Sequence, residues 1–238
     1  MKSFWLALLV AAVITPLVAF GQQEDTLQEK TPEAPAVYAE VTKLLEESKY
    51  AEAVARIDQE LAAGDDDFRL NATKSYIQYK FLDDSPAAMA TIDAAIERKS
   101  TFYKLYEFKV HLIEGGKFEN KPELIVKVYE DIAEAFKNRP DSLSEMGASM
   151  LRGNQEKVRL REALILLKAA KEGAANSAKG VKYTVSVNLA RGYYFASRAD
   201  LAAKEQIEAM EYANDYELIA GKAQLEFYQE AARIAETL

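Results

Sequence analysis

Cysteine is absent from this chain of 238 residues. Its absence excludes disulfide bonds, thiolate nucleophiles and sulfur-ligated metal ions, and therefore any redox chemistry carried by the chain itself. Histidine is almost as scarce, since His111 is the one histidine in the sequence. It has no second histidine at four-residue spacing, so the sequence predicts a structural role for it rather than a zinc site or a Ser-His-Asp triad.

Glycine and proline are also scarce, with 10 and 6 residues respectively. These residues mark the turns between strands, so their scarcity disfavours a fold rich in hairpins. Alanine, glutamate, leucine and lysine are abundant, and all four favour helices. We therefore predict an all-α fold.

Positive charge is outweighed by negative charge, with 30 basic and 38 acidic residues and a net charge of -8. A chain of this charge repels phosphate backbones, so nucleic acid is not expected among its partners. The acidic runs Asp65–Asp67 and Asp83–Asp84 lack the alternating spacing of a calcium-binding loop. We expect these runs to cap helices instead, because negative charge is favourable at a helix N-terminus.

Catalytic motifs are missing as well. The sequence has neither a glycine-rich phosphate loop nor a Gly-x-Ser-x-Gly turn. No pair of carboxylates stands out among the 38 acidic residues as an acid–base couple. The sequence thus predicts a protein that is not an enzyme, with no catalytic residue, no metal site and no cofactor.

The N-terminus has the pattern of a secretory signal peptide. Lys2 precedes an apolar run from Phe4 to Ala19, and small residues follow at Ala19 and Gly21. We predict a signal peptide over residues 1–21, a polar linker over 22–36, and a periplasmic or secreted protein without stable membrane insertion after cleavage. The alternative is a retained membrane anchor, because a run of about 16 to 18 apolar residues is at the lower limit for spanning a bilayer.

From Val37 onward, apolar residues recur at spacings of three and four, the pattern of amphipathic helices. Short polar or glycine-containing breaks separate segments that predict about eleven helices. Ser85, followed by Pro86, has the sequence of a helix N-cap. Ser142 and Glu145 have the spacing of a capping box, so we expect a helix to begin there too.

In most of the second helices of the expected pairs a small residue is followed by a bulky one four residues later, and in the third pair Ile125 takes the place of the small residue. The interval between these stripes is about 35 to 40 residues, the size of one helix-turn-helix repeat. The anchors of the stripes are Ala53, Ala88, Ile125, Ala163 and Ala203.

With this repeat the chain resembles tetratricopeptide-repeat (TPR) proteins, best in Val41–Leu61. The signature positions there are occupied by Leu44, Tyr50, Ala53 and Ile57. The resemblance implies a TPR-like right-handed α-solenoid of antiparallel helix pairs across residues 37–238, with a C-terminal capping helix from Asp215 to Leu238. The Trp-Leu-Gly opening of the TPR unit is absent, and the intervals exceed its 34 residues.

A second resemblance covers residues 160–236, which look like the helical repeat region attached to some exported thioredoxin-like thiol-disulfide proteins of bacteria. Those proteins act through a cysteine pair in a separate domain that this chain lacks. The likeness implies at most a related setting in the bacterial envelope. We therefore predict a non-catalytic scaffold that binds a protein or peptide partner. The alternatives are an accessory protein of envelope thiol-disulfide or maturation enzymes, and a small-ligand carrier or uncharacterised enzyme.

The TPR resemblance implies that the first helix of each pair lines a concave groove for a partner. Consecutive helical residues point about 100° apart, so the adjacent rings of Tyr193, Tyr194 and Phe195 cannot all face one way, and part of this cluster must be core. Counting from the stripe anchors gives five candidate partner-binding residues. They are Ile77, Phe81, Tyr106, Val110 and Phe195.

Overall fold

The computed structural model describes residues 36–65, 67–152 and 159–237. The predicted signal peptide and all but the last residue of the predicted linker lie outside this range. Within it the fold is all-helical, with eleven α-helices, one short 3-10 helix and no strand, as the sequence predicts. None of the described helices is both long enough and apolar enough to cross a membrane.

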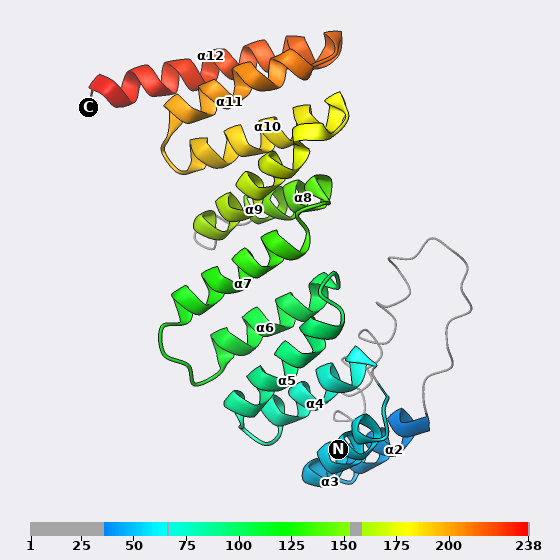
Figure 1. Ribbon diagram of the computed structural model, residues 1–238. Helices are drawn as coiled ribbons and strands as arrows, with labels where there is room; N and C mark the ends of the chain where they lie inside the picture. The colour runs from blue at the N-terminus through cyan, green and yellow to red at the C-terminus, as the bar shows by residue number, and fades with distance from the viewer. Residues whose placement is uncertain (1–35, 66, 153–158, 238) are drawn as a thin grey trace. The chain divides into compact units, whose positions relative to one another are not determined.

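The described residues form two compact units, one ending at Lys121 and one beginning at Pro122. The helices of the first unit are α2 (Ala36–Glu46), α3 (Tyr50–Ala62), α4 (Phe68–Lys80), α5 (Ser85–Arg98) and α6 (Tyr103–Gly115). Those of the second are α7 (Lys121–Ala135), α8 (Pro140–Met150), α9 (Leu160–Gly173), η2 (Ala174–Asn176), α10 (Lys179–Phe195), α11 (Ala199–Tyr212) and α12 (Asp215–Thr237). Helices that follow one another pack together in both units, among them α4 on α5 and α10 on α11 (Figure 1).

The two acidic runs begin helices, as predicted. The carboxylate of Asp67 accepts a hydrogen bond from the Arg69 amide at the start of α4, and that of Asp84 accepts one from the Ala87 amide at the start of α5. The prediction that Ser85 caps α5 is wrong, because Asp84 fills that position and Ser85 is the first helical residue. An aspartate satisfies the same orphan amides and also interacts favourably with the helix dipole.

The predicted capping box of Ser142 and Glu145 is also wrong. Helix α8 begins two residues earlier, at Pro140, whose fixed φ suits the first turn and whose missing N–H is not needed there. A capping box does occur at α12. The Asn214 amide donates to the Glu217 carboxylate, and the Glu217 amide donates to the Asn214 side-chain oxygen.

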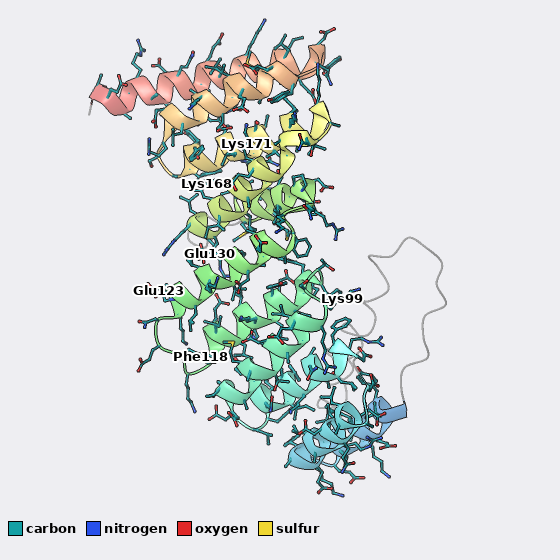
Figure 2. The ribbon with its side chains drawn as sticks, viewed as in Figure 1. Lys99, Phe118, Glu123, Glu130, Lys168 and Lys171 are labelled. Atoms are coloured by element: carbon teal, nitrogen blue, oxygen red, sulfur yellow. The ribbon has the colours of Figure 1, made fainter. Side chains whose placement is uncertain are left out.

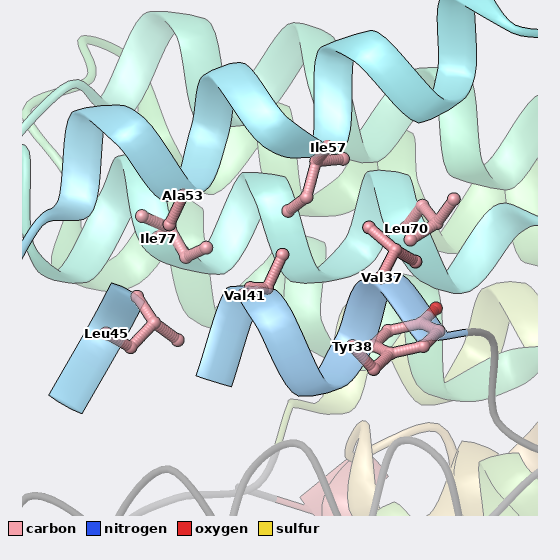
Figure 3. Packing of buried hydrophobic residues seen from close by; sticks show 8 residues of the cluster. All are labelled: Val37, Tyr38, Val41, Leu45, Ala53, Ile57, Leu70 and Ile77. Carbon is pink, nitrogen blue, oxygen red and sulfur yellow. The ribbon is translucent and has the colours of Figure 1, made fainter. Parts of the chain in front are cut away.

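Small hydrophobic clusters hold successive helices together. The first cluster joins α2, α3 and α4 (Figure 3) and consists of Val37, Tyr38, Val41, Leu45, Ala53, Ile57, Leu70 and Ile77. A second cluster joins α4, α5 and α6, and two more lie within the second unit. Each cluster thus combines residues of helices close together in the chain, the packing expected when helical units stack on their neighbours.

The predicted small–bulky stripe forms part of these clusters. Ala53, Ile57, Ala163 and Leu167 are fully buried, which confirms that the stripe is a packing face. In the fifth pair the buried small residue is Ala202, whereas the predicted anchor Ala203 is half-buried. The stripe therefore lies one residue earlier in α11 than the spacing predicts.

Two glycines allow close helix packing in the second unit. A Cβ atom at Gly147 of α8 would lie 2.7 Å from Cγ of Leu167 on α9, and one at Gly192 of α10 would lie 3.0 Å from a methyl of the same leucine. Leu167 therefore fits between α8 and α10 only because both helices present a residue without a side chain. This contact brings α8 and α10 close together with α9 packed against both.

Candidate functional site

The candidate site is a groove between α8 and α10. The Asn188 side-chain amide donates to the Ser144 hydroxyl at 2.9 Å, and farther along both helices Gly192 lies beside Leu151. Because the contacts advance together along both chains, α8 and α10 run in the same direction. The two helices therefore present corresponding ends to the same end of the groove.

The groove has a volume of about 500 Å³ and is open to solvent on one side. Its lining from α8 recurs at spacings of four and three residues, so it is one face of the helix. Helix α8 contributes Asp141, Glu145 and Ala148, the turn after it contributes Arg152, and α10 contributes Gly180, Val181, Thr184, Val185, Asn188 and Arg191.

The two ends of the groove differ in charge. Asp141 and Glu145 stand at the N-terminal end of α8, while Arg152 and Arg191 stand at the C-terminal ends of α8 and α10. Among the described residues, no ion pair neutralises any of these four side chains. The rest of the lining is mostly small or aliphatic, with two polar residues, and consists of Ala148, Gly180, Val181, Thr184, Val185 and Asn188. The arrangement provides an acidic end, a mostly apolar middle and a basic end.

Arg191 also connects the groove to one of the predicted residues. Its guanidinium carbon lies 5.8 Å from the centre of the Phe195 ring, which is within the range of a cation–π contact. Phe195 itself is half-buried against a cluster that includes Leu151 and Leu167. Phe195 therefore supports a groove residue, while the ring itself is not part of the groove lining.

The other four predicted residues lie in the first unit. Ile77, Tyr106 and Val110 are only 0%, 2% and 5% exposed, so they contribute almost nothing to the surface. Phe81 is half-buried and stacks on Tyr50 with 4.4 Å between ring centres. The role of these four residues and of Phe195 in partner binding stays a prediction.

His111 lies on the exposed side of α6. Its ring makes an edge-to-face contact with Tyr79, with 6.0 Å between the ring centres. This contact supplies the imidazole with an aromatic neighbour within its own unit.

Comparisons of the chain with protein-family models, curated proteins and solved structures found no match. The likeness to TPR proteins therefore rests on the stripe spacing and on the helical fold. Function has to be inferred from the geometry of this chain alone.

A partly buried polar link joins the helices behind the groove. The Lys171 ammonium on α9 donates to the Ser186 hydroxyl at 2.7 Å and to the Glu205 carboxylate at 3.0 Å, and it lies 2.7 Å from a carboxylate oxygen of Glu208 (Figure 2). Burial by itself would lower the pKa of Lys171, but the hydrogen bonds to Glu208 and Glu205 raise it above its ordinary value. The charged lysine thus connects α9, α10 and α11.

The sequence reasoning missed the groove because it searched among aromatic residues. The groove is lined by charged, small and β-branched side chains, which are also common on solvated helix faces. A usable signal was present: Asp141, Glu145, Ala148 and Arg152 have the spacing of one helix face, with acidic residues at one end and a basic residue at the other. It indicates a groove only once α10 is known to lie beside α8.

Proposed function

We propose that this chain is an exported, non-catalytic scaffold that binds an extended segment of a protein or peptide partner in the groove between α8 and α10. The observation that carries the proposal is the open groove of about 500 Å³ with carboxylates at one end and guanidinium groups at the other. A deep enclosed pocket with converging polar groups would favour a small ligand instead. An open groove with separated charges suits a chain molecule.

The length and charges of the groove determine which partner segment fits it. Asp141 near the start of α8 and Arg152 just after its end are eleven positions apart, which at the helical rise corresponds to about 16 Å. An extended peptide covers this length with about five residues. A matching segment carries lysine or arginine at the end near Asp141 and Glu145, small apolar residues in the middle, and an acidic residue or carboxylate at the other end.

The architecture that we propose for this scaffold is a TPR-like right-handed solenoid of antiparallel helix pairs. In such a solenoid α8 and α10 are the first helices of the fourth and fifth pairs, the helices implied to line the partner-binding face. The leader sequence supports export to the periplasm or beyond, and the net charge of -8 argues against a nucleic-acid partner. The groove adds a specific place for the partner.

Binding of short peptides tests the proposal. We would measure by fluorescence anisotropy the affinity of the chain lacking residues 1–21 for labelled pentapeptides with one basic and one acidic end, and for peptides with the same apolar middle and two neutral ends. We expect the charged peptides to bind more tightly, and Arg191→Ala to raise their Kd about tenfold, because a charge-assisted hydrogen bond is lost. Asp141→Ala should weaken binding of the same peptides, because their basic end loses a carboxylate partner.

Matched controls remove charges outside the groove. Glu123→Ala on α7 and Lys99→Ala after α5 change exposed residues that do not line it (Figure 2). Both controls should leave the Kd unchanged. Equal affinity for the charged and the neutral peptides, or unchanged binding by Arg191→Ala, would show that the groove is not the binding site.

A further inference from the structure

Helix α12 is apolar on two faces. The inner face packs on α11: Gly221 is buried close to Gln206 and Met210, and Tyr228 is buried in a cluster with Ala190 and Ala202. At about 100° per residue, a second line of apolar residues falls about 120–140° around the helix from the inner face. At one edge of this line the Phe227 ring also contacts Tyr194 of α10, with 5.1 Å between the ring centres. This outer stripe consists of Tyr216, Ile219, Ala220, Ala223, Phe227 and Ile234.

The outer stripe is exposed to an unusual degree for apolar residues. Tyr216 is 89% and Ile219 is 73% exposed, and Phe227 and Ile234 are about half exposed. Four of the seven large apolar side chains that are exposed in the described part of the chain lie on this stripe, whereas the other three are on three different segments. Figure 1 shows α12 with α11 along one side and no other described helix of its unit on the other.

Such a face does not suit a terminal cap. The last element of a stacked helical array normally has a polar outer face, because nothing packs on it. The predicted capping helix is present and packs on α11, but its outer face has the composition of a buried layer. A contiguous apolar surface of this kind on a folded protein marks a contact with another macromolecule.

We propose that the outer stripe of α12 pairs, antiparallel, with the same stripe of a second copy of this chain. A twofold axis level with Leu225 places Tyr216 opposite Ile234 of the other copy and Ala223 opposite its Phe227. Ala223 of each copy then faces the Phe227 ring of the other, and Ile234 of each copy faces Tyr216 of the other. This is the self-complementarity that an isologous interface requires.

The charges beside the stripe point to the same partner. One flank of the helix carries, in order, Asp215, Lys222, Glu226 and Arg233, so the signs read minus, plus, minus, plus. Antiparallel pairing about an axis level with Gln224, one residue from the axis of the stripe, brings Asp215 beside Arg233 of the other copy and Lys222 beside its Glu226, each twice. The parallel arrangement would bring each charge beside its own copy, and like charges would then repel.

Existing contacts leave this flank available. Arg233 pairs with Glu230 on its own helix at 2.7 Å, but both groups are exposed and a single pair of this kind contributes little. Among the described residues, Asp215, Lys222 and Glu226 form no ion pair. Charge complementarity thus favours a second copy over a partner of unrelated sequence, and the inference does not depend on the groove.

Sedimentation of the chain lacking residues 1–21 tests the pairing. We expect a concentration-dependent dimer for the native sequence and a monomer for Ile219→Glu, which places a charge in the stripe. Gln229→Glu adds the same charge to an exposed position off the stripe and should leave the dimer intact. Circular dichroism should give equal helix content for all three proteins, since Ile219 is exposed. A native chain that stays monomeric at every concentration overturns the proposal.

A charge swap tests the identity and orientation of the partner. Arg233→Glu should raise the dimer Kd about tenfold, because two attractive pairs become repulsive. Adding Asp215→Arg should restore it. The two residues are 18 positions, about 27 Å, apart on one helix and cannot contact each other within a single copy. A double variant that dimerises no better than the single variant overturns the proposed pairing.

The absence of cysteine permits a direct geometric test. When Tyr216→Cys and Ile234→Cys proteins are mixed and oxidised, antiparallel pairing predicts a disulfide between the two different variants. Each variant alone should form little disulfide, because its cysteines lie at opposite ends of the interface. Efficient cross-linking of each variant to itself, with none in the mixture, would instead indicate parallel helices and overturn the proposal.

Discussion

At the scale of single residues, burial decides which polar groups matter. The Tyr38 side chain belongs to the cluster of α2, α3 and α4, and its hydroxyl is buried without a hydrogen-bond partner among the described residues. Burial, reinforced by the negative charge of Asp67, raises the pKa of Tyr38 well above its ordinary value. The folded chain therefore keeps this phenol neutral at pH values where an unfolded chain would ionise it.

Tyr38 should make the protein sensitive to alkaline pH. An unfolded tyrosine ionises near pH 10, so stability is fully present below about pH 10 and falls above it, by up to about 1.4 kcal/mol per pH unit for this one group. At pH 7 we expect the unfolding free energy of Tyr38→Phe to lie within about 1 kcal/mol of that of the native chain, because no hydrogen bond is lost.

Urea unfolding followed by circular dichroism between pH 8 and pH 11 checks the expectation. The native chain should lose more stability across this range than Tyr38→Phe. Parallel loss in both proteins would mean that Tyr38 does not control the alkaline transition. Tyr216 is 89% exposed, so Tyr216→Phe is a suitable control that should behave like the native chain.

At the scale of helices, the spacing between neighbours is controlled by small residues. Gly147 and Gly192 allow Leu167 of α9 to contact both α8 and α10, and this packing creates the walls of the groove. From the sequence of a single helix, glycine is recognised only as a residue that disfavours the helix. That it allows close packing is seen only when the neighbouring helix is in place.

Replacing Gly147 by alanine should weaken the second unit. The added methyl would lie 2.7 Å from Cγ of Leu167 and 3.1 Å from the Ala163 carbonyl oxygen, so α8 or Leu167 must move. We expect a loss of about 1–3 kcal/mol in unfolding free energy, the usual effect of overpacking. Gly180→Ala is the matched control, because nothing lies within 4 Å of the new methyl and helix propensity favours alanine by up to about 1 kcal/mol.

Chemical unfolding of the two variants provides the measurement. Gly147→Ala should shift the urea midpoint downward, while Gly180→Ala should leave it unchanged or raise it. Equal shifts for both glycine variants would argue that backbone flexibility, and not the contact with Leu167, controls stability at these positions.

At the scale of the whole molecule, the chain consists of two compact units that meet in sequence at Lys121 and Pro122. The hydrophobic clusters lie wholly within one unit or the other. The groove, the Lys171 link and the outer stripe of α12 all belong to the second unit. The features that we propose for binding and pairing are thus concentrated between Pro122 and Thr237.

Destabilisation should therefore remain within one unit. We expect Gly147→Ala to increase native-state hydrogen exchange in α8, α9 and α10 and to leave exchange in α2 to α6 unchanged, because stability is carried by local clusters. Mass spectrometry of exchanged peptides gives this resolution. Faster exchange throughout α2 to α6 would show that the two units unfold as one.

The sequence by itself determined the helices. Their number, the buried stripe of Ala53, Ile57, Ala163 and Leu167, and the acidic starts of α4 and α5 follow from periodicity and capping, which depend on residues close together in the chain. Even here two details differ from the prediction: α8 begins at Pro140, and the buried small residue of α11 is Ala202 and not Ala203. A local pattern defines a face only to within about one residue.

Only the tertiary structure decided which faces meet and which remain open. Asp141 and Arg191 are 50 positions apart, and they line one groove because α9 packs against both of their helices. Tyr216 and Tyr228 look alike in the sequence of α12, yet one is exposed and the other is buried. Aromatic residues alone do not distinguish a core from a surface, because burial depends on neighbours that are distant in the chain.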